Sequence, residues 1–568
     1  MRQVSSKHSF NLADHQTLMA SQNHPVALWA VVAAAVVFAG GTNLSLDERD
    51  LETVLTGPKG PRTYPVLGNL LQMPMKNFHL EFQKWANEYG PIMSLKLGGQ
   101  DMILLNSPEV VKDLIEKRSN IYSARPDLYI REFGDGLNIA LRDNDETWRR
   151  QRKMYHVRLN VKTANSYLPY QIFESLQLMY DMVEHPDNWV GNLQRYTASI
   201  ASTVLYGWRT PNVYTGYVKG LIEASLWMDR TSAAINLQPV DFFPFLRPWY
   251  RVMPVWMSSF KRALSDIQKL EDRLFYQLLE GAKEKITLGK KYPSFIRDML
   301  IDKDADRLSE RQIAHNAGHG FGAATDTTWN TLLGFVKAMI LFPDVQKKAQ
   351  EEIDQVIGAE CMPSWEDRER LPYIRAVVEE TLRWAPSPIS GAVPHSVACD
   401  DVYNGMKIPK GATVMMNIWT LNHNTYENSR TFDPSRFSAE ATLNESYGIN
   451  ADSLNRPHFT FGAGRRVCPG FHVAERALFL AISRLLWGFE LHRKVDANGT
   501  PLPINRDAVT PGFIVRPEAF ECDIRPRGPE RVALIKSAWK EAQTRLDADG
   551  NFKEEFFQSM LSKKERQS

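Results

Sequence analysis

The segment FGAGRRVCPG, residues 461–470, constrains the fold of this chain more than any other part of the sequence. It holds one cysteine, Cys468, with two glycines before it and one after it. Glycine adopts backbone conformations that other residues avoid, so such a loop can bring backbone N–H groups close to a sulfur atom. Arg465 and Arg466 add positive charge beside the cysteine, which favours the thiolate over the thiol. The segment therefore predicts a tight loop around an anionic sulfur. Hydrogen bonds from the backbone N–H groups of this loop to the sulfur would tune the redox potential of any metal that the sulfur binds.

Composition excludes several classes of protein. The 568 residues include only four cysteines, which rules out a disulfide scaffold, and none of them forms the CxxC pair of a zinc ribbon. We interpret Cys361, Cys399 and Cys522 as small buried apolar residues. Lys and Arg number 68 against 66 Asp and Glu, a net charge of +2, so no basic excess points to nucleic acid.

The N-terminal region predicts a membrane anchor. Residues 25–46 contain no Lys, Arg, Asp or Glu. A helix needs about 20 apolar residues to cross the hydrocarbon layer, so we predict a transmembrane anchor at 25–46 behind a leader at 1–24. A cleaved signal peptide is the alternative, but its polar leader would be long and its basic start poor. Prolines within residues 47–69 then predict a stiff, non-helical hinge before a globular body.

The body of the chain predicts many helices and few strands. Short strand-like runs occur at residues 92–97 and 102–105. Helical periodicity predicts helices at residues 304–341, 344–357, 373–384 and 471–487. Length alone suggests several domains. After Arg527 the chain is charged and helix-prone, and we interpret it as an appendage.

The cysteine segment resembles the haem-binding signature FGxGxRxCxG of the cytochrome P450 family at every defined position. The resemblance covers roughly residues 55–530 and implies one catalytic domain at 70–530, mainly α-helical with a small β-rich lobe, followed by a charged helical extension at 531–568. It implies that Cys468 is the axial ligand of haem b, that Phe461 shields the sulfur, and that Arg466 pairs with a haem propionate.

Glu380 and Arg383 lie three residues apart on a predicted helix. Such a pair on a helix surface would contribute only a few tenths of a kcal/mol. The resemblance implies instead the family's buried ExxR pair, completed by a later arginine whose place Arg436 occupies. A planar guanidinium suits this structural role because it bonds a carboxylate with two parallel donors.

The segment Ala323–Thr328 reads AATDTT within a long predicted helix. Alone it predicts a kinked or solvated patch, because threonine hydroxyls compete for backbone carbonyls. Beside the cysteine signature it resembles the family's oxygen-side segment, where the helix opens locally. The resemblance implies that Asp326 and Thr327 are the catalytic acid–alcohol pair that relays protons during dioxygen cleavage.

The anionic propionate groups of a haem need hydrogen-bond donors from the protein. Trp148 and Arg152 resemble the family's WxxxR motif, and His395 stands at another position that members use for the same purpose. Arg125, in a Ser-Ala-Arg-Pro turn, is a fourth candidate. Each of these residues taken singly is more often an ordinary surface or core residue.

Three further features have two interpretations each. Arg149, Arg150, Lys153 and Arg465 could form a docking face for an acidic redox partner or a solvated charged face. The aromatic segment 241–250 could be a buried loop or could enter the membrane interface. His315 and His319 have the spacing of a zinc pair, but no third ligand is evident in the sequence, so we do not predict zinc.

The function implied by the resemblance is monooxygenation: insertion of one atom of O2 into a lipophilic small molecule. Electrons would come from NADPH through a flavin-containing P450 reductase, because this chain carries no flavin or nicotinamide fingerprint. The motifs and the anchor resemble fungal members that tailor secondary metabolites, which implies a single-pass protein of the endoplasmic reticulum membrane with its catalytic domain in the cytosol. Apolar stretches expected to line the pocket are residues 128–139, 242–245, 389–393 and 510–514.

Other functions remain open at this stage. A haem-thiolate isomerase, dehydratase or peroxygenase would need no reductase, although it would also have no need of the Asp326–Thr327 relay. A non-catalytic haem-binding membrane protein would consume no oxygen. An anchored structural protein would bind no haem at all.

Overall fold

The computed structural model describes residues 56–74, 76–213, 216–232, 238–290, 292–302, 307–437, 447, 452–512 and 514–558. The predicted leader and transmembrane anchor lie outside these residues. Among the residues described, no helix combines the length and the apolar character that a membrane crossing requires. The anchor therefore stays a prediction.

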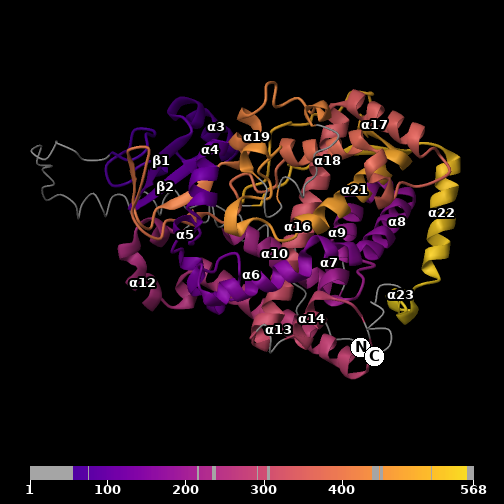
Figure 1. The fold of residues 1–568 in the computed structure, drawn as a ribbon, viewed down its shortest axis with the longest axis horizontal. Coiled ribbons are helices and arrows are strands. Elements are labelled where there is room, and N and C mark those ends of the chain that lie inside the picture. The colour runs from indigo at the N-terminus through magenta and orange to yellow at the C-terminus, as the bar shows by residue number, and fades with distance from the viewer. Residues whose placement is uncertain are drawn as a thin grey trace, which may run out of the picture.

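Helices dominate the described chain and pack around one long central helix (Figure 1). In the first half of the chain they are α3 (Phe78–Tyr89), α4 (Pro108–Val111), α5 (Ser119–Tyr122), α6 (Glu146–Leu159), α7 (Val161–Ser166), α8 (Leu168–Glu184), α9 (Trp189–Tyr206), α10 (Gly216–Ser232), α11 (Pro239–Phe242), α12 (Arg247–Val252) and α13 (Ser259–Thr287). In the second half they are α14 (Phe295–Ile301), α16 (Glu310–Leu341), α17 (Pro343–Val356), α18 (Pro372–Trp384), α19 (Ile418–Asn424), α21 (Phe471–Gly488), α22 (Pro529–Gln543) and α23 (Glu554–Gln558).

The strands of the described residues form one sheet of four strands, in the order β1-β2-β6-β3, and two antiparallel pairs, β4-β5 and β7-β8. In the larger sheet β2 and β6 run parallel and the other neighbours run antiparallel. This sheet lies beside α3 and α4 at one end of the molecule, and α22 covers the opposite end (Figure 1). The strands are β1 (Ile92–Leu97), β2 (Gln100–Leu105), β3 (His395–Ser396), β4 (Asp401–Tyr403), β5 (Met406–Ile408), β6 (Thr413–Met416), β7 (Phe489–Arg493) and β8 (Cys522–Pro526). The mainly helical fold with a small β-rich lobe is therefore confirmed.

The central helix α16 begins where its sequence supplies a cap. The Ser309 side chain accepts a hydrogen bond from the backbone N–H of Gln312, and the Gln312 side chain accepts one from Ser309, so both free N–H groups are satisfied. The helix ends at Leu341, and Pro343 begins α17. Helix α16 packs against α9, α13 and α21 and has buried residues along most of its length. It can therefore carry functional side chains into the interior.

The segment after Arg527 is not an appendage, contrary to the prediction. Ile535, Trp539 and Ala542 form a buried stripe on α22 that packs against α8, and the Trp539 ring lies 5.6 Å from the Phe173 ring between centroids. The i, i+4, i+7 spacing of these residues is the periodicity of a core-facing helix. Abundant charged residues on the other faces of α22 concealed this stripe in the sequence.

The loop between α22 and α23 contributes an aromatic side chain to the core. Phe552 is 2% exposed, and its ring packs against Tyr170 and Phe173 and lies 5.3 Å from the Arg209 guanidinium. We expect Phe552→Ala to lower the free energy of unfolding by about 3–5 kcal/mol, because it leaves a cavity between these groups. Urea titration of the purified protein measures this change. Val495→Ala, at a side chain that is 49% exposed, is the control; equal stability of the two variants would contradict the prediction.

His79 is a buried, uncharged histidine on α3. It is 0% exposed, and its ring lies 4.3 Å from Trp419 between centroids. Burial, with the charge of Arg430 as a smaller cause, lowers the pKa of His79 from 6.5 to about 4. The unfolded chain therefore binds a proton at His79 more readily than the folded chain does, and stability is lost as the pH falls below 6.5 toward 4.

This pKa difference gives a measurable pH dependence. We expect His79 to account for about 2 kcal/mol of the stability lost between pH 7 and pH 5. In His79→Phe, which keeps an aromatic ring in the site, the difference between urea unfolding free energies at the two pH values should be smaller by this amount. An unchanged difference would show that His79 is not the group responsible.

Two of the cysteines differ from their predicted environment. Cys522, on β8, is buried as predicted, but Cys361 and Cys399 are exposed. Both lie in irregular surface segments between regular elements, where burial of a small apolar side chain is not required.

Candidate active site

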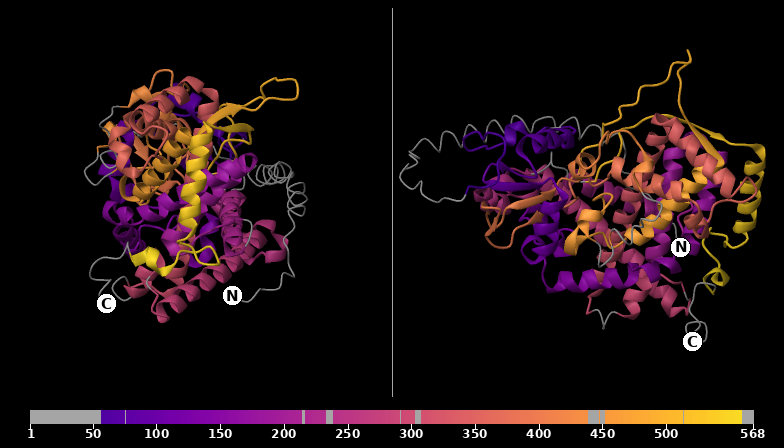
Figure 2. Two further views of the ribbon diagram at one scale, coloured as in Figure 1. Left: turned by 90° about the vertical axis from the view of Figure 1, so that its right-hand side faces the viewer. Right: turned by 45° about the horizontal axis from the view of Figure 1, so that its top comes forward.

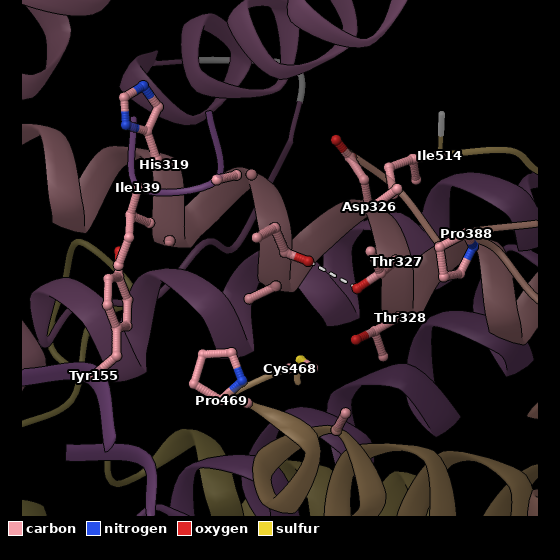
Figure 3. A pocket seen from close by; sticks show the side chains of 18 of the residues that line it. Ile139, Tyr155, His319, Asp326, Thr327, Thr328, Pro388, Cys468, Pro469 and Ile514 are labelled. Carbon is pink, nitrogen blue, oxygen red and sulfur yellow. Dashed lines mark hydrogen bonds between the residues drawn. The ribbon is translucent and has the colours of Figure 1, made fainter. Parts of the chain in front are cut away.

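A cavity of about 520 Å³ lies between α16 and the loop that carries Cys468 (Figure 3). Cys468 and Pro469 lie on one side of it, and Asp326, Thr327 and Thr328 lie on the other (Figure 3). The structure brings together nine of the predicted site residues as lining of this cavity: Arg125, Trp148, Arg152, Asp326, Thr327, His395, Phe461, Arg466 and Cys468.

The predicted apolar lining is correct in part. Ile139, Gly391–Val393 and Ile514 contact the cavity, each from one of the predicted stretches. Residues 242–245 do not line it, so that prediction is wrong. Phe242 and Phe243 instead pack against β1, β2 and α3, because the turn that holds them folds back on the β-rich lobe.

The loop around Cys468 depends on its glycines. Gly462 and Gly464 have φ values of +75° and +63°, which favour glycine, and a Cβ at Gly464 would lie 2.4 Å from the carbonyl oxygen of Ile115. The backbone N–H of Cys468 donates to the Phe461 carbonyl at 2.9 Å and closes the turn. The loop therefore holds the sulfur at a defined place on the cavity wall.

The charged side chain that lies near the Cys468 sulfur is not the one predicted. Burial raises the pKa of the Cys468 thiol, while backbone N–H groups of Gly470 and Phe471 and the charge of Arg152 act in the opposite direction. Arg465, which the sequence suggested as a neighbouring charge, is exposed on the surface. The cation that stabilises the thiolate comes instead from α6, because the Arg152 guanidinium donates to the carbonyl of Val467 and so lies beside the loop.

Phe461 packs within an aromatic group beside the cysteine loop. Its ring lies 5.2 Å from that of Tyr447 and 6.2 Å from that of Phe471 between centroids. His458 adjoins the same group and bonds Glu379 through Nε2 at 3.1 Å. Aromatic rings therefore cover the protein side of the loop.

Arg466 and Arg125 are held by carbonyl groups at the cavity wall. Arg466 donates to the carbonyls of Ser123 at 2.8 Å and Arg142 at 2.9 Å, and its guanidinium lies 4.5 Å from the Trp148 ring centroid. Arg125 donates to the carbonyls of Ala140, Val393 and Pro394 at 2.6–2.8 Å. His395 Nδ1 donates to the carbonyl of Tyr122 at 2.7 Å.

These basic groups disfavour one another's charged forms. Burial and the charge of Arg466 lower the pKa of Arg125 well below its usual value. Burial, followed by the charge of Arg125, lowers the pKa of His395 to about 3, and burial lowers that of Arg466 to about 10. A buried cluster of this kind is stabilised by an anion bound between its members. The residues therefore fit a haem: this cluster would hold its carboxylates, and Cys468 would supply the ligand to its iron.

Helix α16 carries Asp326 and Thr327 opposite Cys468 (Figure 3). The Thr327 hydroxyl donates to the Ala323 carbonyl at 2.7 Å, and the Thr331 hydroxyl donates to the Thr327 carbonyl at 2.9 Å. Asp326 is 5% exposed. The predicted local opening of the helix is wrong for this structure: α16 is continuous from Glu310 to Leu341. Threonine hydroxyls that bond to carbonyls four residues earlier are compatible with an unbroken helix.

Glu380 and Arg383 lie outside the cavity, in the adjoining core. Both side chains are 0% exposed and are joined by two hydrogen bonds of 2.6 and 2.8 Å. Arg383 also donates to the carbonyls of Asn422 and Ser429. Arg436 lies 3.7 Å from Glu380 Oε1. The three predicted structural residues are therefore neighbours, and they tie α18 to the chain segment that leads to the cysteine loop.

One part of the cavity wall was not predicted from the sequence. Glu271 on α13 lies 3.5 Å from His319 on α16, and both line the cavity. Ligand atoms of Glu271, His315 and His319 all lie within 4.8 Å of one another, so the histidine pair does have a third neighbour. Only the packing of α13 against α16 reveals it, because the two helices are far apart in the chain.

Comparison with known proteins agrees with this geometry. The family model described as Cytochrome P450 matches residues 58–521. The chain is 38% identical over 501 residues to the cytochrome P450 monooxygenase virE of Hypocrea virens, covering 87% of this chain and 90% of the relative. It is 38% identical over 500 residues to the cytochrome P450 monooxygenase fogE of Aspergillus ruber, covering 87% and 91%.

A solved zebra fish cytochrome P450 with abiraterone has a TM-score of 0.61 and 22% identity, covering 79% of this chain and 100% of that chain, which shows the same fold. A cavity lined by a cysteine loop on one side and by Asp326 and Thr327 on the other fits a haem-thiolate enzyme. The chain belongs to the cytochrome P450 family and is a monooxygenase of that family.

Proposed function

We propose that this monooxygenase oxidises a lipophilic intermediate of fungal secondary metabolism with electrons from NADPH, delivered by a flavin-containing P450 reductase. One substrate C–H bond, O2, NADPH and one proton give one C–OH group, water and NADP⁺. The observation that carries the proposal is the cavity itself, in which Cys468 faces Asp326 and Thr327 across an apolar space. The similarity to named fungal monooxygenases supports it.

The chain's own residues have two tasks toward the cofactor. Cys468 would supply the thiolate ligand, and Arg125, Arg152, Arg466 and His395 would hold the anionic carboxylates. When bound, the haem supplies the redox chemistry by which dioxygen is activated. Because Arg125, His395 and Arg466 are already fixed by backbone carbonyls, they need little rearrangement to bind these carboxylates.

Asp326 and Thr327 would move protons into the cavity. Reducing O2 so that one oxygen atom enters the substrate and the other leaves as water consumes two protons, and both leave in that water. The hydrogen of the product hydroxyl comes from the substrate C–H bond. The Thr327 hydroxyl faces the cavity and already bonds the Ala323 carbonyl, so a small rotation transfers its hydrogen bond to a group in the cavity. Asp326, at the preceding position of α16, would resupply the proton.

The basic surface formed by α6 and the cysteine loop is the proposed docking face for the reductase. Arg149, Lys153 and Arg465 are exposed, and the bond from Arg152 to the Val467 carbonyl brings α6 and the cysteine loop side by side. An acidic surface of the reductase would be attracted to this face and would come close to the cysteine side of the haem.

A membrane location is also proposed. In the aromatic segment 241–250, Phe242 and Phe243 are buried, whereas Trp249 on α12 is 74% exposed. Trp256 is 72% exposed, and Phe245, Val252 and Met257 are exposed nearby. Such a patch suits the membrane interface and would supplement the anchor at 25–46. We expect the full chain in the endoplasmic reticulum membrane, facing the cytosol; extraction by alkaline carbonate would contradict this.

Gene deletion and feeding test the function. The precursor that accumulates after deletion is supplied to microsomes that contain this protein and the reductase, under ¹⁸O2. We expect a product with one ¹⁸O atom that forms only with NADPH. Product without NADPH would indicate an isomerase, dehydratase or peroxygenase, and haem binding without oxygen consumption would indicate a carrier.

A further inference from the structure

The wall of the cavity between α13 and α16 carries ionisable side chains that the proposed chemistry does not use. Glu271 and His319 line the cavity there, and His315 lies one helical turn before His319. We call Glu271, His315 and His319 the polar subsite. The lining around it is apolar and includes Val204, Leu205, Leu221, Ala224 and Phe275. Figure 3 shows His319 away from Asp326 and Thr327 along the same helix, near Ile139 and Tyr155.

Glu271 and His319 are incompletely paired. Their closest atoms, Glu271 Oε2 and His319 Nε2, are 3.5 Å apart, whereas a good N–H···O bond measures 2.7–3.2 Å. His319 Nδ1 is buried and has no hydrogen-bond partner among the described residues. A carboxylate acceptor and an imidazole N–H therefore face one cavity without satisfying each other fully, and such groups bind a ligand that satisfies both.

Neighbouring side chains hold the residues of the polar subsite in place. His315 Nε2 bonds the carboxylate of Asp272 at 2.8 Å. The Phe275 ring meets the His315 and His319 rings edge-on, with centroids 5.1 and 5.5 Å apart. Phe275 fits there because Gly318 has no side chain; a Cβ at that position would lie 2.2 Å from the ring. The site is therefore preorganised before a ligand binds.

We propose that the polar subsite binds a hydroxyl group of the substrate, a point that rests on the proposed function. A hydroxyl donates to the Glu271 carboxylate and accepts from a His319 N–H at the same time. A carboxylate would be repelled by Glu271, and an ammonium group has no acceptor for the His319 N–H. The substrate class is thus an elongated lipophilic alcohol or phenol.

The position of the subsite also limits where the substrate is oxidised. His319 and Thr327 are on the same helix, eight residues apart, which corresponds to about 12 Å along the axis. A substrate held by its hydroxyl at His319 presents to Cys468 and Thr327 a carbon remote from that hydroxyl. The oxidised carbon and the hydroxyl group are therefore on the order of 10 Å apart.

Zinc is a weaker explanation of the same residues. Ligand atoms about 2.0–2.2 Å from a tetrahedral zinc ion are roughly 3.4 Å from one another. The three ligand atoms of the polar subsite are spread over as much as 4.8 Å, and one nitrogen of His315 already bonds Asp272. Closing them around an ion would move side chains that Phe275 holds apart.

Equilibrium dialysis of the haem-loaded full chain tests the proposal with two probes of equal size, 4-hydroxybiphenyl and 4-methylbiphenyl. We expect the hydroxyl probe to bind at least about tenfold more tightly, the range of a hydrogen bond to a charged group. In His319→Phe, which keeps the ring contact with Phe275, and in Glu271→Gln, this ratio should fall to threefold or less. Glu280→Gln on the same helix, with a side chain that is 64% exposed, should keep the full ratio.

Several outcomes would contradict the hydroxyl site. Equal binding of the two probes, failure of the hydroxyl probe to bind, or a ratio unchanged in His319→Phe and Glu271→Gln would overturn the proposal. So would a preference that disappears with EDTA and returns with Zn²⁺, since the residues would then hold a metal. Haem content and the Soret band of the reduced, carbon monoxide-treated variants are measured separately. Loss of these signals in the unmodified chain would refute the proposed function rather than the hydroxyl site.

Discussion

Cys468→Ser is expected to remove the long-wavelength Soret band that reduced, carbon monoxide-treated haem-thiolate proteins show, and to lower oxygenase turnover by more than about 100-fold. A serine hydroxyl stays protonated where a cysteine can ionise, so it cannot supply an anionic ligand. The surrounding loop should persist, because its turn depends on the backbone bond from residue 468 to the Phe461 carbonyl and on glycines with positive φ. Absorption spectra and turnover in reconstituted microsomes measure the two effects.

Cys361→Ser is the matched control for this prediction. Cys361 is exposed and lies away from the cavity lining, so its substitution should leave both the spectrum and turnover unchanged. A Cys468→Ser protein with normal turnover would refute the assignment of Cys468 as the haem ligand. Loss of activity in Cys361→Ser as well would point to a general effect of cysteine removal.

Arg383→Ala is expected to lower the free energy of unfolding by about 3–5 kcal/mol, the cost of breaking a buried ion pair from one side. The substitution leaves Glu380 buried at 0% exposure without the two hydrogen bonds, of 2.6 and 2.8 Å, that Arg383 donates to it. It also removes the donors to the carbonyls of Asn422 and Ser429, which connect α18 to α19 and the segment after it. Arg436, 3.7 Å from Glu380, is too distant to replace these bonds fully.

Urea unfolding and the rate of haem loss measure this prediction. Arg370→Ala is the control, because Arg370 is 61% exposed and its pair with Asp367 should contribute less than about 1 kcal/mol. The double variant Glu380→Gln/Arg383→Met should be less destabilised than Arg383→Ala, since no uncompensated charge stays buried. A loss below 1 kcal/mol in Arg383→Ala would show that the pair is not structural.

Helix boundaries were predictable where local signals mark them. The predicted helices at 373–384 and 471–487 correspond to α18, Pro372–Trp384, and α21, Phe471–Gly488. Proline in the first turn of α18 and the apolar periodicity of α21 are both short-range signals. The start of the predicted helix at 304 differs from the observed start at Glu310, which the Ser309 cap determines.

The predictions that proved wrong share a cause, which is that they depend on contacts between distant parts of the chain. Arg465 was expected near the sulfur because it is a neighbour in sequence, but the short turn at 464–466 directs it outward, and Arg152 of α6 takes that place. The C-terminal segment was interpreted as an appendage because it is rich in charged residues, yet three apolar positions suffice to dock α22 on α8. In both cases a contact between distant parts of the chain outweighs the local pattern.

The sequence by itself determined the cysteine loop and the chemistry that it can support. Ten consecutive residues carry the glycines that permit its turns and the sulfur at its centre, and short-range backbone preferences need no other part of the chain to act. Only the tertiary structure decided which cations surround the cavity and which polar groups face the substrate. The pairing of Glu271 with His319 arises because apolar faces of α13 and α16 pack together, and a single sequence does not specify how two such faces align.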